Sequence, residues 1–349
     1  MKAPEFPQNL RWFNLPAEIS VPLRSKAAED GAKAGSRGLE MKELRGRPVL
    51  IDFWTYSCVN CIRALPHLKR WHGLYSPLGL VIVGVHTPEF DFEKNVENVA
   101  RAIKELGVEY PVAMDSDYQI WSSYSNNVWP RKFLVDKDGQ IVYDHSGEGN
   151  YRETEEAIQK VLLETNPKLK LPTINYATGP STQLGVNGAC YPTTPETYLG
   201  SMRGRSGNVW RFAGDWKVHP EYVEHQRKTE NFEDYIVLNF EAAEVNLVME
   251  CAGERPAKVR LELGGSLPAE ALALPKPSAK RRSAQAGASP TTSAVEGLTA
   301  GGRFLKETEV RDAKMYNLIS GDKILKRELK IYVKDQGLRA YAFTFGGCV

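Results

Sequence analysis

Residues 49–61 read VLIDFWTYSCVNC, and this stretch decides the fold of the first half of the chain. Its first six residues are apolar or β-branched apart from Asp52, which is typical of a central strand covered on both faces. Residues 59–75 follow with apolar side chains at spacings of three, which predicts a helix. Cys58 and Cys61 therefore fall where a buried strand passes into a helix.

That position makes Cys58 the expected nucleophile of a redox-active dithiol. The unpaired amides and the dipole at a helix N-terminus favour the thiolate, and only the thiolate attacks a disulfide. Cys61, one turn further along, would resolve the mixed disulfide. The alternative is half of a structural zinc site, which needs a second close pair of ligands. His67 and His72 lie five apart and the other three cysteines are isolated, so we expect no metal and no cofactor.

Two residues around the cysteines support this interpretation. Asp52 lies in a run that otherwise reads as buried, where a carboxylate has a raised pKa and can exchange the proton of Cys61. The alternative is an inert aspartate at a strand end. Pro66 falls inside the predicted helix, where a proline must produce a kink.

The order of the predicted elements defines an α/β domain. Between residues 48 and 164 the chain alternates strand and helix, with a strand at 79–85, a helix at 92–106 and a hairpin turn at 137–139. This order predicts parallel strands that end in an antiparallel hairpin. His86 then stands at the same sheet edge as Cys58, although a surface histidine beside a loop is the favoured interpretation.

The second half of the chain reads as all-β. Residues 245–251, 258–263 and 329–334 alternate apolar and polar side chains, which predicts strands with one face inward and, together, a β-sandwich. The expected organisation is an α/β domain over 1–166, a linker over 167–195 and a β-sandwich over 196–349, with a flexible insertion at about 264–302.

The composition excludes several classes of function. The 349 residues are 42% hydrophobic and 25% charged with a net charge of +2, which indicates no nucleic acid or anionic membrane partner. No apolar run approaches the roughly 20 residues of a membrane span. Met1 leads into a proline-rich start with no apolar leader, so we expect a cytoplasmic location, or an extracytoplasmic one if the sequence is a truncated mature protein.

These motifs resemble a known family. Residues 49–61, with Pro66 after them, are similar to thioredoxins, and the segments at 4–7, 12–14 and 53–61 look like the thioredoxin modules of DipZ-like proteins. Residues 194–200 and 340–346 resemble the DipZ C-terminal domain, a jelly roll similar to carbohydrate-binding modules. The resemblance implies a thioredoxin-like α/β fold followed by an all-β, jelly-roll-like sandwich.

The resemblance also implies how substrate is bound. The proline before the strand at 132–136, Pro130, resembles the cis-proline of the TlpA-like branch, which guides an extended substrate backbone. Trp54 and Trp129 are expected to flank the sulfurs and shape the substrate groove, although core packing is equally compatible with the sequence.

The expected function is thiol-disulfide exchange on protein disulfides, in the reducing direction by analogy with the TlpA-like branch. The partners are then a protein disulfide and a thiol electron donor, either a CcdA-like membrane protein or one like thioredoxin reductase. The membrane domain usual in DipZ proteins is absent from this sequence, which leaves the donor open.

Two other functions remain as alternatives. One is a peroxiredoxin-like peroxidase, which is disfavoured because a peroxidatic cysteine typically has no partner three residues away. The other is a carbohydrate-binding protein that uses the thioredoxin fold as a scaffold. Its glycan would stack on four aromatic residues of the second domain, Tyr198, Trp210, Trp216 and Tyr222.

Overall fold

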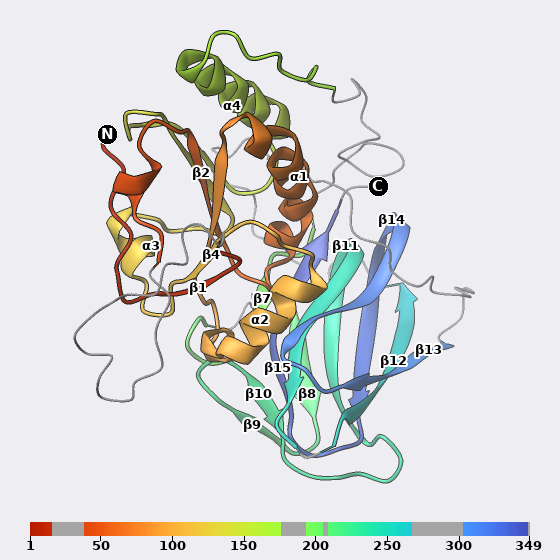
Figure 1. Ribbon diagram of the computed structural model, residues 1–349. Coiled ribbons are helices and arrows are strands. Elements are labelled where there is room, and N and C mark those ends of the chain that lie inside the picture. The colour runs from red at the N-terminus through yellow and green to blue at the C-terminus, as the bar shows by residue number, and fades with distance from the viewer. Residues whose placement is uncertain (16–37, 176–192, 205–208, 254, 267–302, 348–349) are drawn as a thin grey trace, which may run out of the picture. The chain divides into compact units, whose positions relative to one another are not determined.

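The protein is described by a computed structural model that covers residues 1–15, 38–175, 193–204, 209–253, 255–266 and 303–347 (Figure 1). The chain divides into two compact units, Met1–Ala177 and Thr178–Val349. Most of the predicted linker and nearly all of the predicted insertion lie outside the described residues, so the boundaries expected from the sequence stay predictions.

The first unit is a mixed six-stranded sheet with helices, in the strand order β1-β4-β3-β2-β5-β6. Its strands are β1 (Arg11–Phe13), β2 (Val49–Trp54), β3 (Val81–His86), β4 (Val112–Met114), β5 (Arg131–Val135) and β6 (Ile141–Ser146). Its helices are α1 (Val59–Tyr75), α2 (Val96–Glu105), α3 (Gln119–Ser123) and α4 (Tyr151–Thr165), with short 3₁₀ turns η2 (Met41–Leu44), η3 (Ser76–Leu78) and η4 (Asp91–Lys94). Strands β2, β3 and β4 are parallel, and β5 and β6 form the expected antiparallel hairpin. The predicted thioredoxin-like α/β fold is confirmed.

Strand β2 is the centre of this sheet, and all six of its residues are buried. Val49, Ile51 and Phe53 share one core cluster with α3 and the N-terminal segment. Because alternate residues of a strand point to opposite faces, Asp52 and Trp54 point to the other face of the sheet. The polar side chain of Asp52 is thereby carried into the interior.

The second predicted helix begins later than expected. The apolar pattern predicted a helix from residue 92, but α2 starts at Val96 and is preceded by η4. Asn95 is the reason, because its side-chain oxygen accepts hydrogen bonds from the amides of Glu97 and Asn98 and so caps a new helix. The short elements β1, β4 and α3 were not predicted at all.

The second unit is a curled, entirely antiparallel sheet, which fits the predicted β-sandwich. Its path is β13-β12-β14-β11-β15-β10-β9, with β7 paired to β15 and β8 paired to β11. The strands are β7 (Thr197–Tyr198), β8 (Trp210–Ala213), β9 (Trp216–Val218), β10 (Val223–His225), β11 (Asp234–Cys251), β12 (Ala257–Ser266), β13 (Arg303–Val310), β14 (Lys314–Val333) and β15 (Leu338–Gly346).

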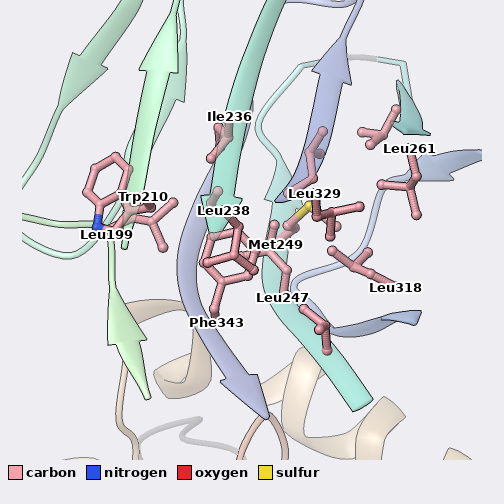
Figure 2. Close-up of a cluster of buried hydrophobic side chains, with 14 of the residues drawn as sticks. Leu199, Trp210, Ile236, Leu238, Leu247, Met249, Leu261, Leu318, Leu329 and Phe343 are labelled. Atoms are coloured by element: carbon pink, nitrogen blue, oxygen red, sulfur yellow. The ribbon is translucent and has the colours of Figure 1, made fainter. Parts of the chain in front are cut away.

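The long strand β11 makes the sheet curl. Its first half pairs with β8 and its second half with β15, while β14 runs along its other edge. The apolar core gathers on this strand, with Ile236, Leu238, Leu247 and Met249 pointing into one cluster (Figure 2). One expectation was wrong here: the alternation placed only one face of residues 245–251 inside, yet the intervening Asn246 and Val248 are buried as well.

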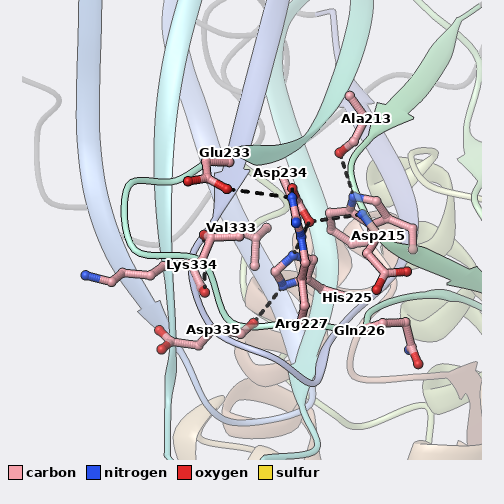
Figure 3. A network of polar contacts seen from close by, with 12 residues as sticks. Ala213, Asp215, His225, Gln226, Arg227, Glu233, Asp234, Val333, Lys334 and Asp335 are labelled. Atoms are coloured by element: carbon pink, nitrogen blue, oxygen red, sulfur yellow. Dashed lines mark hydrogen bonds and ion pairs between the residues drawn. The ribbon is translucent and has the colours of Figure 1, made fainter.

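An ionic network lies at one end of this sheet, with His225 and Asp234 buried and Arg227 partly exposed (Figure 3). The ring nitrogens of His225 lie 3.0 Å from a carboxylate oxygen of Asp234 and 2.9 Å from the carbonyl oxygen of Asp335. Arg227 donates two hydrogen bonds to the same carboxylate, at 2.8 and 2.5 Å. These donors hold the pKa of Asp234 well below its usual range. Asp234 thus joins the ends of β10, β11 and β14.

We predict that Asp234→Asn destabilises this end of the sheet by about 3 kcal/mol, because two cationic or donor groups lose a buried anionic partner. Amide hydrogen exchange of the β10–β11 peptides at pH 7 measures the loss. The matched control is Glu307→Gln, which breaks the exposed Arg260–Glu307 pair and should cost less than about 1 kcal/mol. Equal protection factors in the two variants would contradict a structural role for the network.

Candidate active site

The dithiol lies at the junction of β2 and α1. Cys58 is the N-cap residue of α1, and the amide of Cys61 donates a hydrogen bond to its sulfur at 3.3 Å. Cys58 is partly exposed, whereas the side chain of Cys61 is 1% exposed. Both are free thiols in this structure. Only the first sulfur can therefore meet an incoming disulfide.

The two thiols differ in how readily they ionise. Burial raises the pKa of the Cys61 thiol well above its usual value, and the neighbouring Cys58 sulfur raises it further. A resolving thiol in this environment stays protonated until a base takes its proton.

Asp52 is the nearby carboxyl group that can act as that base. It is 1% exposed, and its pKa is raised to about 6 by burial, against the opposing charge of Lys132. The Lys132 ammonium lies 3.6 Å from one carboxylate oxygen, across the β2–β5 pairing of these two residues. Neither oxygen of Asp52 has a hydrogen-bond partner among the described residues. The inert strand-end alternative does not fit a buried mid-strand carboxyl of this kind.

Pro130 lies at the same edge of the sheet as the dithiol. The register pairs Phe53 with Arg131, so the residue before β5 stands beside the end of β2. The Trp129–Pro130 peptide bond is cis. Pro130 is buried and its carbonyl accepts a hydrogen bond from Gly147 at 2.7 Å.

The two tryptophans expected to shape the groove have different environments. Trp129 is partly exposed, and its ring nitrogen donates to the carbonyl oxygen of Thr87 at 3.1 Å. Its ring centroid lies 4.3 Å from that of Trp121, which is also partly exposed. Trp54 is fully buried and packs edge-on against His86. Core packing is therefore the interpretation that fits Trp54, while Trp129 remains accessible.

His86 was expected at the surface, and that expectation was wrong. It is completely buried at the end of β3, directly opposite Trp54 in the parallel register. Tyr56 stacks on its ring at 5.5 Å, and the Thr55 hydroxyl lies 3.4 Å from one ring nitrogen. Burial lowers the pKa of His86 to about 3, so the ring is neutral near pH 7.

Sequence reasoning missed Glu93. This residue of η4 is completely buried, and one carboxylate oxygen accepts hydrogen bonds from both the amide and the hydroxyl of Ser57, the residue before Cys58. The stretch around it, residues 89–94, has three other charged residues, so nothing in the sequence marked Glu93 as the side chain that reaches a turn 36 residues away.

The aromatic residues expected to bind sugar do not form one open platform. Trp210 is buried, Trp216 packs on His225, Tyr222 on Tyr341, and Arg203 lies over Tyr198. Three of the four rings thus have a neighbour packed against them, and the fourth is buried.

The described ranges contain no cluster of three or more histidine, cysteine, aspartate or glutamate side chains arranged to bind a metal ion. Nor do they contain a helix that is both long and apolar enough to cross a membrane.

The mixed sheet, the C-x-x-C pair capping α1 and the proline beside it are the features of a thioredoxin-like fold with a dithiol site. Comparison with known proteins agrees. Residues 18–162 match the family model described as Redoxin, and residues 287–346 match the one described as Thioredoxin like C-terminal domain. The N-terminal domain thus resembles redoxins and is similar in sequence to parts of DipZ and ResA.

Three curated relatives illustrate the similarity. Protein DipZ of Mycobacterium bovis is 43% identical over 166 residues, 48% of this chain and 23% of DipZ. NHL repeat-containing protein 2 of Bos taurus is 33% identical over 168 residues, 48% of this chain and 20% of that protein. The thiol-disulfide oxidoreductase ResA of Bacillus cereus is 28% identical over 123 residues, 35% of this chain and 68% of ResA. The alignment spans less than a quarter of the first two relatives.

Asp52→Asn tests the state of the buried carboxyl through stability. Asp52 is neutral in the folded chain up to about pH 6 but ionises near pH 3.8 in the unfolded chain. The free energy of unfolding therefore falls as the pH rises between these two values. Asparagine does not ionise, so the variant does not lose this stability. We predict equal stability of variant and wild type at pH 4, and a variant that is up to about 3 kcal/mol more stable at pH 8.

Urea unfolding of the reduced full chain at both pH values, followed by tryptophan fluorescence, measures this difference. Asp144→Asn is the control, since it removes an exposed carboxylate paired with Arg131 and should lower stability by less than about 1 kcal/mol. A wild type as stable as Asp52→Asn at pH 8 would mean that Asp52 ionises without penalty.

Proposed function

We propose that this protein reduces disulfide bonds in other proteins through the dithiol of Cys58 and Cys61. The observation that carries the proposal is the asymmetry of the pair: an accessible sulfur capping a helix, within hydrogen-bond distance of the amide of a buried partner. A helix N-terminus favours the thiolate that exchange requires.

The proposed reaction transfers two electrons to the substrate. The Cys58 thiolate attacks one sulfur of the substrate disulfide, the substrate S–S bond breaks, and the departing thiolate takes a proton from solvent. Asp52 then accepts the proton of Cys61, whose thiolate attacks the Cys58 sulfur and breaks the mixed disulfide. The second substrate sulfur leaves as a thiolate and takes up the proton held by Asp52. The protein is left with a Cys58–Cys61 disulfide, and a thiol donor must return the two electrons.

The reducing direction is proposed by analogy with the TlpA-like branch that the N-terminal domain resembles. Burial and the negative charge of Asp52 raise the pKa of Cys61, so this thiol stays protonated until a base takes its proton.

Pro130 and Trp129 are proposed to receive the substrate chain. Pro130 stands beside the end of β2, and Trp129 is the accessible aromatic residue next to it. A peptide laid in extended form along this edge would bring its disulfide to Cys58.

The expectations about the binding partners and the cellular location stay predictions. The identity of the thiol donor, whether CcdA-like or like thioredoxin reductase, and the cytoplasmic location are among them. A glycan ligand of the second domain is another, and the packing of its four aromatic residues against their own neighbours does not favour it.

Trapping tests the proposal directly. Cys61→Ala should accumulate mixed disulfides between Cys58 and substrate proteins, because the resolving thiol is gone, and Cys58→Ala should trap none. The measurement is non-reducing electrophoresis and mass spectrometry after alkylation of the host cells. Insulin reduction should fall at least about 100-fold in either variant, since the thiol contributes the whole of its step.

Cys251→Ala is the matched control, a free and partly buried thiol of the second unit that should leave both readouts unchanged. Peroxide consumption that survives Cys61→Ala, with no trapped protein, would replace the proposal by the peroxidase alternative.

A further inference from the structure

The turn that carries Cys58 is held from outside by a single buried carboxylate. Glu93 lies in η4, completely buried. One of its oxygens accepts hydrogen bonds from the Ser57 amide at 3.2 Å and from the Ser57 hydroxyl at 2.7 Å. The other accepts from the amides of Glu89 and Phe90, at 2.6 and 3.1 Å. The carboxylate therefore bridges the turn after β2 and the turn after β3.

Local structure explains the contacts of one carboxylate oxygen of Glu93 but not those of the other. An acidic residue at the third position of a helix commonly reaches back to the N-cap amide, as the second oxygen does here for Phe90. The first oxygen does not stabilise η4, because both of its hydrogen bonds come from Ser57, which lies in another segment. Burial raises the pKa of Glu93 to about 7 despite these donors, so keeping the carboxyl here is costly.

A continuous series of covalent and hydrogen bonds connects Glu93 to the dithiol. Ser57 is covalently joined to Cys58, whose amide donates to the carbonyl oxygen of Thr55 at 3.4 Å. The sulfur of Cys58 in turn accepts from the amide of Cys61. A shift of Ser57 would therefore move the N-cap residue of α1, and with it the sulfur.

We propose that Glu93 is a positioning residue for the dithiol: it acts through Ser57 to hold the Cys58 sulfur in the orientation from which it attacks. The inference rests on the proposed exchange reaction, in which the rate depends on how the Cys58 sulfur is presented. Misplacing a reacting group by an ångström can cost orders of magnitude in rate.

The test measures the reactivity of Cys58 without any disulfide substrate. The full chain carrying Cys61→Ala is alkylated with iodoacetamide at pH 7.5, alone and with Glu93→Gln, Ser57→Ala or both. We expect each single change to slow alkylation about tenfold. The double change should be no slower than the slower single one, because residues that act through one contact are not additive.

Glu155→Gln is the matched control. Glu155 is a second completely buried glutamate of the same unit, and it accepts hydrogen bonds from Trp71 and Tyr75 near the far end of α1. Its loss should lower stability but leave the alkylation rate of Cys58 within twofold. Circular dichroism establishes that each variant is folded.

A second measurement separates positioning from general support of the fold. In the chain with both cysteines, Glu93→Gln should change the equilibrium constant of the dithiol with glutathione at least threefold, and Glu155→Gln should not. Failure of insulin reduction by wild type would refute the proposed function alone, since neither measurement uses a protein substrate.

Three results would overturn the inference. They are an unchanged alkylation rate in Glu93→Gln, additive effects of the Glu93 and Ser57 changes, and an equal slowing by Glu155→Gln. If Glu93→Gln does not fold, Glu93→Asp, which shortens the reach of the carboxylate to both the amide and the hydroxyl of Ser57, takes its place: an alkylation rate equal to that of the parent would exclude positioning through Ser57.

Discussion

The hydrogen bond from the amide of Cys61 to the sulfur of Cys58 is the interaction on which the site depends. It exists because only four residues separate the end of a fully buried strand, β2, from the start of helix α1, so that the cysteine sulfur takes the place that a serine or aspartate oxygen usually occupies at an N-cap. The strand is anchored on both sides by parallel and antiparallel neighbours. The helix start, and with it the sulfur, is therefore fixed by the centre of the sheet.

Around this bond the protein buries polar groups that would be costly elsewhere. Asp52 and Lys132 face each other inside the sheet, His86 is enclosed at the end of β3, and Glu93 is enclosed beside Ser57. Burial disfavours the charged form of each titratable group, which raises the pKa values of both carboxyls and lowers that of the histidine. Such a concentration of shifted groups beside an accessible thiol is typical of a reaction site rather than of a structural core.

The second unit also contains a buried carboxylate, but there it has a structural role. Its long strand β11 is shared by several neighbours, and an apolar cluster fills the curl that results. At the end of that strand Asp234 is fully paired with Arg227 and His225, which lowers its pKa instead of raising it. A carboxylate paired in this way stabilises structure, whereas Asp52 faces the Lys132 ammonium at 3.6 Å and accepts no hydrogen bond among the described residues.

The sequence by itself determined the sheet-to-helix junction, the position of the two cysteines at that junction, and the change from α/β to all-β, because these depend on local periodicity and on the spacing of a few residues. Asp52 was expected from its place in an apolar run, and Pro130 only from the resemblance to TlpA-like proteins. The sequence did not determine the environment of single side chains. Whether Trp54 and His86 are inside or outside depends on what covers the sheet edge, and the bridge from Glu93 to Ser57 joins segments 36 residues apart. Only the tertiary structure decided these points, since burial and long-range hydrogen bonds arise when distant segments meet, and no local pattern encodes that meeting.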